Sequence, residues 1–417
     1  MIEEVKVVSH RFKIPNSHKL STILSYGAYR VLSIGLAKSR EAIIDMIVQS
    51  GLRGKGGGGA LTGEKWELMP KDNSKPSYLV VNCDESEPGT FKDRQIISKD
   101  PHLLLEGMIL TSYAIGANSA YIYIRGEYQE FEAILQEAID DAYERGYLGK
   151  NIIGQGFDLD ITIHRGAGAY ICGEKSALLE SLEGKRGHPR LKPKTKEPEW
   201  YFGNPTLVNN VETITTVPYI IENRPAAYRR FGTKDSAGAM LFAISGHIER
   251  AGVYEVAFGT PMLEYINQFG GGVRGGKRLK AVIPGGSSTP ILTADEVAEA
   301  TLDYETLRGL GSSLGTGGMI VMDEDTDMVE ALKNLLEFYH DESCGQCTPC
   351  REGTGLSDTL LEKILDGRGT SADIDKLLGV ADIMNGKTIC VFAPAVSGVI
   401  KSFISKFRNE FEAKGGR

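Results

Sequence analysis

The sequence predicts a layered α/β domain, followed by a small β-rich domain and a helical C-terminal part. Over about the first 235 residues, short β-rich runs alternate with helical patterns, which is typical of an α/β layer domain. From about 238 to 320, short alternating runs are separated by glycines, and from Asp327 onward the pattern is helical. No repeat of fixed period is evident, so a solenoid is not expected.

The elements of the first domain follow from hydrophobic periodicity. Three β-rich runs predict strands: YLVVN (78–82), AYIYI (120–124) and DITIH (160–164). Apolar residues from Phe131 to Ala142 recur at the i, i+3, i+4 spacing of an amphipathic helix. The stretch 185–205 is rich in proline and basic residues and has no periodicity, so we expect a long loop that crosses the surface or a site.

Composition excludes several classes of protein. The 417 residues are 41% hydrophobic and 24% charged, which is ordinary for a soluble globular protein. The most apolar stretch, from His102, contains Glu106 and is shorter than the roughly 20 residues that span a bilayer. The acidic N-terminus does not resemble a signal peptide, and a formal charge of -8 argues against nucleic acid as a partner. We therefore expect a cytoplasmic protein without direct membrane insertion.

The cysteines of the helical part predict a metal centre. Cys344, Cys347 and Cys350 stand at intervals of three, and Cys390 follows 40 residues later. Three plus one thiolates suit a [4Fe–4S] cluster, in which each iron needs one thiolate. Zinc is the alternative, although its usual signature is paired C-x-x-C knuckles or cysteine with histidine.

Other residues refine this hypothesis. His340 is the only histidine within ten residues of the triplet. Pro349 favours a rigid open loop over a helix between the second and third cysteines. Cys83 and Cys172 lack metal-ligand spacing, so we expect them to be buried thiols.

A glycine-rich stretch, GLRGKGGGGALTGEKW at 51–66, is the second signal. It contains G-x-G-x-x-G at Gly54, Gly56 and Gly59, but a helical pattern precedes it, whereas a Rossmann fingerprint follows a strand. A backbone with so many glycines can approach a phosphate or a flat ring and offer N–H donors. Lys65 adds a positive charge, and Leu52, Leu61 and Trp66 are expected to anchor the segment.

An acidic stretch, VVNCDESEPGTFKDR at 80–94, is the third signal. Asp84, Glu85 and Glu87 follow a predicted strand end, where α/β sheets commonly build ligand sites. Crowded carboxylates repel one another unless they bind polar ligand atoms or a cation, so the sequence favours a site. The alternative is a solvated turn closed by Pro88 and Gly89.

Five stretches in order resemble one known family. They are GLRGKGGGG with TGEKW, NCDESEPGTFKDR, GAGAYICGEKSALLESLEGKRGHPRLKP, NPTLVNNVET, and ESCGQCTPCREG with the later TIC. This pattern is similar to the NADH-binding flavoprotein subunit of respiratory complex I, a family that recurs in soluble NAD(P)-linked hydrogenases and formate dehydrogenases. The resemblance implies a Rossmann-like flavin-binding α/β domain (1–235), a ubiquitin-like β domain (236–325) and a C-terminal four-helix bundle with the cluster (326–417).

The resemblance also implies cofactors and site residues. The cofactors are FMN and one [4Fe–4S] cluster, with NAD(P)H as substrate. FMN would contact Gly54, Gly56, Lys65, Asn82, Asp84, Glu85, Tyr170, Gly173, Glu174, Val208, Asn209, Asn210 and Thr213. The nicotinamide nucleotide would lie near Glu87, Lys175 and Lys192, and the cluster ligands would be Cys344, Cys347, Cys350 and Cys390. A hydride passes to the flavin, which can release electrons singly, so no side chain is expected to act as a catalytic nucleophile or base.

Departures from the family concern the nucleotide. Where the family typically has G-E-E-T-A, this chain has GEKSA, so Lys175 replaces a glutamate near the adenosine ribose. A carboxylate there repels a 2′-phosphate, whereas a lysine attracts one. Family aromatics are also replaced, by Ala60, Leu68 and Thr195. Three interpretations of Lys175 therefore remain open. The lysine confers a preference for NADP(H), or it belongs to a site that has lost affinity for the nucleotide, or it is a neutral change that leaves NADH use intact.

Two functions follow from these readings. In the first, the chain is an oxidoreductase subunit that exchanges a hydride with NAD(P)H through FMN and single electrons with the cluster. In the second, it is an electron-transfer adaptor that keeps both cofactors but no longer binds the nucleotide, within a larger redox complex. The expected partners are a small thioredoxin-like [2Fe–2S] subunit and a larger multi-cluster iron–sulfur subunit. The location is then the cytoplasm or the periphery of the inner membrane as part of such a complex.

Overall fold

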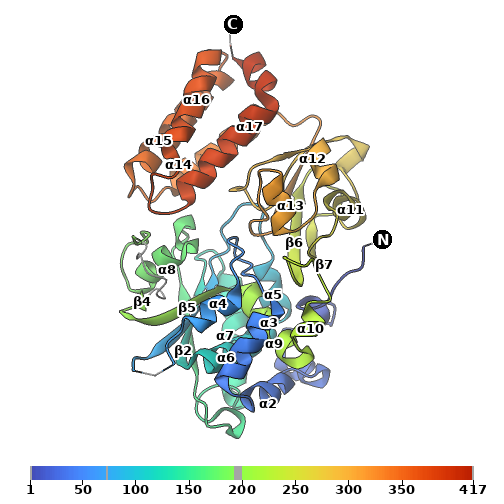
Figure 1. The fold of residues 1–417 in the computed structure, drawn as a ribbon, viewed down its shortest axis with the longest axis vertical. Helices are drawn as coiled ribbons and strands as arrows, with labels where there is room; N and C mark the ends of the chain where they lie inside the picture. Colours follow the sequence, from blue (N-terminus) through green and yellow to red (C-terminus); the bar gives the residue numbers. More distant parts are fainter. Residues whose placement is uncertain (1, 72–73, 192–199, 416–417) are drawn as a thin grey trace.

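Two sheets and a group of C-terminal helices make up the molecule (Figure 1). The computed structural model describes residues 2–71, 74–191 and 200–415. In the first sheet the strand order is β3-β2-β1-β5-β4. The strands are β1 (Ser77–Cys83), β2 (Ala117–Ile124), β3 (Asp160–Arg165), β4 (Trp200–Tyr201) and β5 (Asn204–Asn210). β1, β2, β3 and β5 are parallel, and β4 pairs antiparallel with β5.

The strand order creates a crevice at one edge of this sheet. From β1 the chain proceeds to β2 and β3 on one side and then returns to β5 on the other side. Ligands of such sheets bind at the carboxyl ends of the strands where the order reverses. Asn82 and Asn210 are paired at that point, at the ends of β1 and β5. The fold therefore directs a ligand to the ends of these two strands.

Helices cover both faces of this sheet, which explains why β1 is apolar on both sides. Leu79, Val80 and Val81 are all fully buried, as expected for a covered parallel strand. The helices here are α1 (Leu20–Ile23), α2 (Arg30–Leu36), α3 (Arg40–Ser50), α4 (Thr62–Glu67), α5 (Asp93–Lys99), α6 (Pro101–Ile115), α7 (Gln129–Glu144), α8 (Lys175–Leu182), α9 (Val211–Asn223) and α10 (Pro225–Tyr228). The predicted strands and the helix from Phe131 to Ala142 are confirmed.

The most apolar stretch forms α6, which is a buried core helix packed against α9. Asp100 caps its start by accepting a hydrogen bond from the Leu103 N–H (3.1 Å), and Gly116 ends it with φ +73°. None of the helices in the described ranges is long and apolar enough to cross a membrane.

The second sheet has the strand order β7-β6-β10-β8-β9. Its strands are β6 (Ala239–Gly246), β7 (Gly252–Ala257), β8 (Leu279–Ile283), β9 (Leu292–Thr293) and β10 (Gly318–Asp323). β10 runs parallel to β6 and antiparallel to β8. Three short helices accompany the sheet: α11 (Met262–Gln268), α12 (Ala294–Glu299) and α13 (Tyr304–Gly309). The predicted β-rich region is confirmed, and its core is a separate cluster around Phe242 and Tyr265.

The C-terminal part consists of helices, as the periodicity predicts. They are α14 (Met328–Glu342), α15 (Thr348–Leu365), α16 (Ser371–Met384) and α17 (Phe392–Lys414). α14 packs on α15 and α17, and α16 packs on α15 and α17. Asp327 caps α14 by accepting from the Val329 N–H (2.9 Å). In Figure 1 these helices lie side by side above the first sheet, and the β domain lies to their right and below.

Three local predictions differ from the structure. Trp200–Tyr201 forms β4 and pairs with Asn204 and Pro205, so an ordered hairpin replaces the end of the predicted loop 185–205. Residues 192–199 of that loop lie outside the described residues. Leu61, an expected anchor, is 39% exposed, whereas Leu52 and Trp66 are buried.

Pro349 does not keep the cysteine segment open. α15 begins at Thr348, so Pro349 and Cys350 stand in its first turn. Proline is tolerated there because the first N–H groups of a helix have no intrahelical acceptor. Cys344 and Cys347 remain in the loop between α14 and α15, and Cys390 directly precedes α17.

Candidate functional site

Asn82 ties the end of β1 to a neighbouring turn. Its side-chain N–H donates to the Gly173 carbonyl (2.9 Å), and its carbonyl oxygen accepts from the Asp84 N–H (3.0 Å). Gly173 belongs to the short 3₁₀ helix Tyr170–Gly173. Burial raises the pKa of Asp84 to about 7, although the Ser86 hydroxyl, 3.1 Å away, opposes the shift. The edge of the sheet thus holds a buried carboxyl group that is easily neutralised.

Glu85 is engaged with the start of α5. Its carboxylate accepts from the N–H groups of Asp93 (2.7 Å) and Arg94 (3.2 Å) and from the Tyr128 hydroxyl (2.9 Å). Burial, and then the neighbouring Asp93 carboxylate, raise the pKa of Glu85 to about 7. The predicted contact of Glu85 with a cofactor would therefore have to use its backbone, because its side chain anchors a helix.

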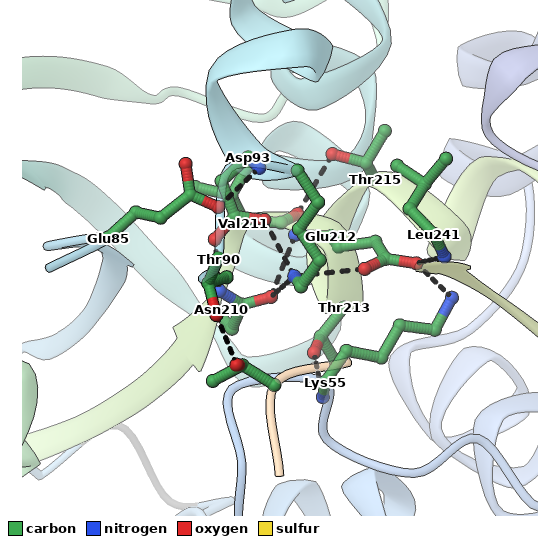
Figure 2. A network of polar contacts seen from close by, with 12 residues as sticks. Lys55, Glu85, Thr90, Asp93, Asn210, Val211, Glu212, Thr213, Thr215 and Leu241 are labelled. Atoms are coloured by element: carbon green, nitrogen blue, oxygen red, sulfur yellow. Dashed lines mark hydrogen bonds and ion pairs between the residues drawn. The ribbon is translucent and has the colours of Figure 1, made fainter. Parts of the chain in front are cut away.

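A buried ionic network lies behind the glycine-rich loop (Figure 2). Glu212 in α9 pairs with Lys55 (3.2 Å) through one carboxylate oxygen and with Lys92 (2.9 Å) through the other. All three side chains are essentially excluded from solvent. Burial acts to raise the pKa of Glu212, but Lys55 and Lys92 hold it below the ordinary value. Glu212 is thus a carboxylate that two ammonium groups keep ionised.

Asn210 and Thr213 join this network to the loop. The Asn210 side chain donates to Asp93 (2.6 Å) and caps α9 by accepting from the Glu212 N–H (3.0 Å). The Thr213 hydroxyl accepts from the Lys55 N–H (2.9 Å). The start of α9 therefore lies beside the glycine-rich loop, as Figure 2 shows.

The loop itself is held between the two sheet domains. The Gly54 N–H donates to the Ala60 carbonyl (2.8 Å), and the Tyr304 hydroxyl donates to the Gly54 carbonyl (3.2 Å). Gly59 has φ +62°, and a Cβ there would lie 2.3 Å from the Tyr304 ring. A Cβ at Gly56 would lie 3.1 Å from the Asn210 Cβ. The close approach of Tyr304 and Asn210 explains why positions 59 and 56 are glycines.

Lys65 and Asn209 also have protein partners at this edge. The Lys65 ammonium donates to the Val208 carbonyl (2.7 Å), which fixes α4 against β5. The Asn209 side chain accepts from the indole N–H of Trp66 at 3.4 Å. The structure therefore brings Gly54, Gly56, Lys65, Asn82, Asp84, Val208, Asn209, Asn210 and Thr213 to one region, at the ends of β1 and β5.

Glu87 and Tyr170 meet at the border of this region. The Tyr170 hydroxyl donates to Glu87 (2.6 Å), and the Tyr170 N–H donates to Glu342 of α14 (3.0 Å). Glu174 caps α8 by accepting from the N–H groups of Ser176 (2.9 Å) and Ala177 (3.0 Å). Lys175 is the first residue of α8 and is exposed, whereas Lys192 and Thr195 lie outside the described residues.

The four cysteines of the helical part surround one cavity. Cys344, Cys347, Cys350 and Cys390 line it together with Ile171, Pro189 and Phe392, among others, and the empty space of about 280 Å³ includes open solvent. The Ile389 N–H donates to the Cys347 sulfur at 3.4 Å. Burial raises the pKa of Cys390 to about 11.

The donor set of this cavity fits a polynuclear cluster. Within the described ranges no group of three or more His, Cys, Asp or Glu side chains is placed so that it could hold a metal ion. Four thiols spread around a shared space instead suit a [4Fe–4S] cube, whose thiolates each bind a different iron. Iron would also supply the positive charge that ionises a thiol such as Cys390.

Several residues of the site are not apparent from sequence motifs. Arg186 and His188 each contact the Cys344 carbonyl at 3.2 Å, although more than 150 residues separate them from it. Lys55, Lys92 and Glu212 lie in or beside the quoted motifs, but the motifs do not predict their roles. A lysine among glycines and a Lys-Asp pair in an acidic loop are signals of buried ion pairing, which could have identified the first two.

Family models match all three parts of the chain. The Nuo51 FMN-binding domain matches residues 47–219, an SLBB domain matches 240–329, and the NADH-ubiquinone oxidoreductase-F iron-sulfur binding region matches 330–414. Fold and site together define an oxidoreductase subunit with a flavin-binding domain and an iron–sulfur domain.

Relatives identify the family. The chain is 49% identical to the F subunit of NADH-quinone oxidoreductase from Rickettsia bellii, over 95% of this chain and 96% of the relative. It is 47% identical to the corresponding protein of Rickettsia felis, over 99% and 98%. A crystal structure of NAD+-reducing [NiFe]-hydrogenase in the H2-reduced state aligns with TM-score 0.85 at 35% identity, covering 95% of this chain and 67% of that chain. The chain belongs to the family of NADH-quinone oxidoreductase F subunits.

Proposed function

We propose that this chain takes electrons from NADH at the carboxyl edge of the first sheet and passes them to a cluster among the four cysteines. The observation that best supports this proposal is the position of the turn Tyr170–Gly173. Ile171 of this turn lines the cysteine cavity, and the Gly173 carbonyl accepts from Asn82 at the sheet edge. One turn thus borders both regions, which supports short-range electron transfer between two cofactors.

The flavin would occupy the crevice between β1 and β5. The chemistry that FMN supplies when bound is acceptance of a hydride and release of single electrons. The glycine-rich loop and the start of α9 offer backbone N–H groups, which suit a phosphate. We assign to this site Gly54, Gly56, Lys65, Asn82, Asp84, Glu85, Tyr170, Gly173, Glu174, Val208, Asn209, Asn210 and Thr213. The work of these residues is orientation, because hydride transfer needs no protein nucleophile.

Anaerobic titration of the reconstituted protein with NADH tests this function. We expect NADH to bleach flavin absorbance near ~450 nm, a property of the flavin ring. The iron should be lost in Cys390→Ser, because a hydroxyl is a poor iron ligand. Cys172→Ser is the matched control, since Cys172 is buried outside the cavity lining. A flavin that dithionite reduces but NADH does not would instead support the adaptor function.

Lys175 raises a question of nucleotide preference. We assign Glu87, Lys175 and Lys192 to the neighbourhood of the nicotinamide nucleotide. An ammonium group on an exposed first residue of a helix favours a 2′-phosphate and hence NADPH. NADPH should then reduce the flavin at a lower concentration than NADH does, and Lys175→Glu should reverse the order. An unchanged order in Lys175→Glu would mean that the substitution is neutral.

The finer architecture is also a proposal. We place the domain boundaries at 1–235, 236–325 and 326–417. The order β7-β6-β10-β8-β9, with the parallel pair β6 and β10 at its centre, supports a ubiquitin-like β domain. The mutual packing of α14, α15, α16 and α17 supports a four-helix bundle.

Other subunits must receive the electrons, since the family is named as one subunit of an oxidoreductase. We propose a small thioredoxin-like [2Fe–2S] subunit and a larger multi-cluster iron–sulfur subunit as partners. Within such an assembly the chain would be a peripheral part of a membrane complex or a component of a hydrogenase-type enzyme, as in the similar hydrogenase structure.

A further inference from the structure

Glu87 lies where all three parts of the molecule meet. Its carboxylate accepts from the Tyr170 hydroxyl (2.6 Å) of the first part. It also accepts from the Ser288 N–H (2.7 Å) and the Ser287 hydroxyl (3.2 Å), which belong to the β domain. The Ser287 oxygen in turn lies 2.7 Å from the hydroxyl of Tyr339 in α14. A carboxylate of the sheet edge therefore depends on the other two parts for its position.

The contact between Glu87 and the β domain is too close for a side chain larger than hydrogen. Gly286 has φ +99°, and a Cβ there would lie 2.5 Å from the Glu87 Cγ. The Gly286 N–H donates to the Gly318 carbonyl (2.6 Å), and the Ser287 N–H donates to the Pro88 carbonyl (3.1 Å). The turn at 286–288 is thus fixed by one backbone bond to β10 and by one to Pro88, the residue after Glu87.

The hydroxyl groups form a directed chain. A serine hydroxyl has one proton, so while Ser287 donates to Glu87, Tyr339 is the donor to Ser287. Both Ser287 and Tyr339 are essentially excluded from solvent. Consecutive hydrogen bonds in a buried site strengthen one another, so loss of the outer bond weakens the inner one.

The Glu87 carboxylate still has an acceptor position that a ligand can use. An ionised carboxylate has about four acceptor positions. In the part of the chain that the structure describes, three donors contact the Glu87 carboxylate, and two of them share one oxygen, Oε1. Among the described residues only Tyr170 donates to the Oε2 atom, which can therefore accept one further hydrogen bond in a fixed direction.

We propose that Ser287 of the β domain and Tyr339 of α14 are positioning residues for the nucleotide. They act through Glu87 by holding its carboxylate in one orientation, so that the β domain and the cluster-bearing helices complete the nucleotide site. This inference rests on the proposed function, in which Glu87 adjoins the nicotinamide nucleotide.

The test uses the holoprotein with an artificial electron acceptor and measures KM for NADH, kcat and flavin content. Loss of one hydrogen bond to a charged acceptor should raise KM by about 5- to 10-fold in Ser287→Ala. Tyr339→Phe keeps the Ser287 bond to Glu87, so its KM should rise by only about 2- to 5-fold. Flavin content and kcat should stay near the wild-type values, which a general loss of structure would not allow.

The double variant separates positioning from packing. In a Glu87→Ala background, Ser287→Ala should change KM by less than about 2-fold, because the group it positions is gone. Matched controls are Ser245→Ala, whose hydroxyl donates to the Met319 carbonyl (3.3 Å), and Tyr265→Phe, whose hydroxyl donates to the Phe242 carbonyl (2.7 Å). Both lie in the β domain without a contact to Glu87, so KM should not change.

If the wild-type holoprotein oxidises NADH, two results would overturn the inference. One is an unchanged KM in Ser287→Ala, and the other is an equal rise in KM with and without Glu87. A wild-type holoprotein that does not oxidise NADH would overturn the proposed function as well, so the two failures are distinguishable.

Discussion

At the scale of single residues, several charged side chains that are buried in this molecule pair with other buried charges. Glu212 pairs with two buried lysines at once, Lys92 also pairs with Asp93 (2.8 Å), and neither lysine has access to water. An ion pair removed from water contributes little net stability, but loss of one partner is costly because it leaves an unpaired buried charge. The Glu212 carboxylate also accepts from the Leu241 N–H (2.8 Å), which joins α9 to β6. One side chain therefore supports the glycine-rich loop, α9 and the β domain.

The Glu212→Gln substitution should make the first domain less stable toward unfolding. The variant leaves Lys55 and Lys92 without their shared counter-charge, so the free energy of unfolding should fall by about 3–5 kcal/mol. Urea unfolding followed by tryptophan fluorescence measures this, because both tryptophans of the chain, Trp66 and Trp200, lie in the first domain.

Glu222→Gln is the control on the same helix. Glu222 pairs with Arg30, whose side chain is 71% exposed, so the change should be within about 0.5 kcal/mol. Equal effects of the two substitutions on the free energy of unfolding would mean that losing a buried charge costs no more than losing an exposed one.

At the scale of elements, the glycine-rich loop shows why composition alone does not describe a site. Its glycines serve different needs: Gly59 combines a positive φ with close approach to Tyr304, whereas Gly58 has neither. The same distinction applies to Pro349, which starts α15 rather than breaking it. The position of a residue within its element decides what the residue does.

Gly59→Ala should be destabilising and Gly58→Ala should not. A Cβ at Gly59 would overlap the Tyr304 ring and force a left-handed backbone on alanine, at a cost of about 1–3 kcal/mol. A Cβ at Gly58 has no atom within 4 Å. Thermal unfolding of the flavin-free protein measures both, because the bound flavin does not then contribute. A lower midpoint in Gly58→Ala than in Gly59→Ala would contradict this account.

At the scale of the whole molecule, long-range contacts join the N-terminal segment to the β domain. Glu255 of β7 is buried and accepts from the N–H groups of Val8 (2.9 Å) and Ser9 (2.9 Å), and its own carbonyl accepts from the Val5 N–H (3.0 Å). Figure 1 shows the N-terminus beside this strand. The chain thus crosses between the two sheet domains near its start as well as after α10.

Glu255→Ala should release the N-terminal segment locally. The amides of Val8 and Ser9 lose charge-assisted hydrogen bonds, so their hydrogen exchange should accelerate by at least about 10-fold. Exchange of amides in the α14–α17 region should not change. Glu249→Ala is the control, because Glu249 is exposed and accepts from the Gly275 N–H (2.7 Å). Identical protection of Val8 in Glu255→Ala and in wild type would refute the role of Glu255.

Local sequence patterns determined the elements and the kinds of chemistry. Alternating strands and helices indicated the α/β domain, periodicity indicated the C-terminal helices, and three cysteines at intervals of three indicated a cluster. These features depend on neighbours within a few residues, which is why they can be read before folding. The order of five motifs also identified the family, which the relatives confirm.

Only the tertiary structure decided which partners these residues have. It turns Glu85 toward α5, sets Glu212 between Lys55 and Lys92, and seats Glu87 against Ser287 of another domain. Buried polar groups must find partners wherever packing brings them, and the sequence separation of those partners ranges from 8 residues for Glu85 and Asp93 to 200 for Glu87 and Ser287. The sequence by itself therefore determined the elements and the cofactor classes, whereas the folded structure decided the orientation of each carboxylate, because orientation depends on packing between distant segments.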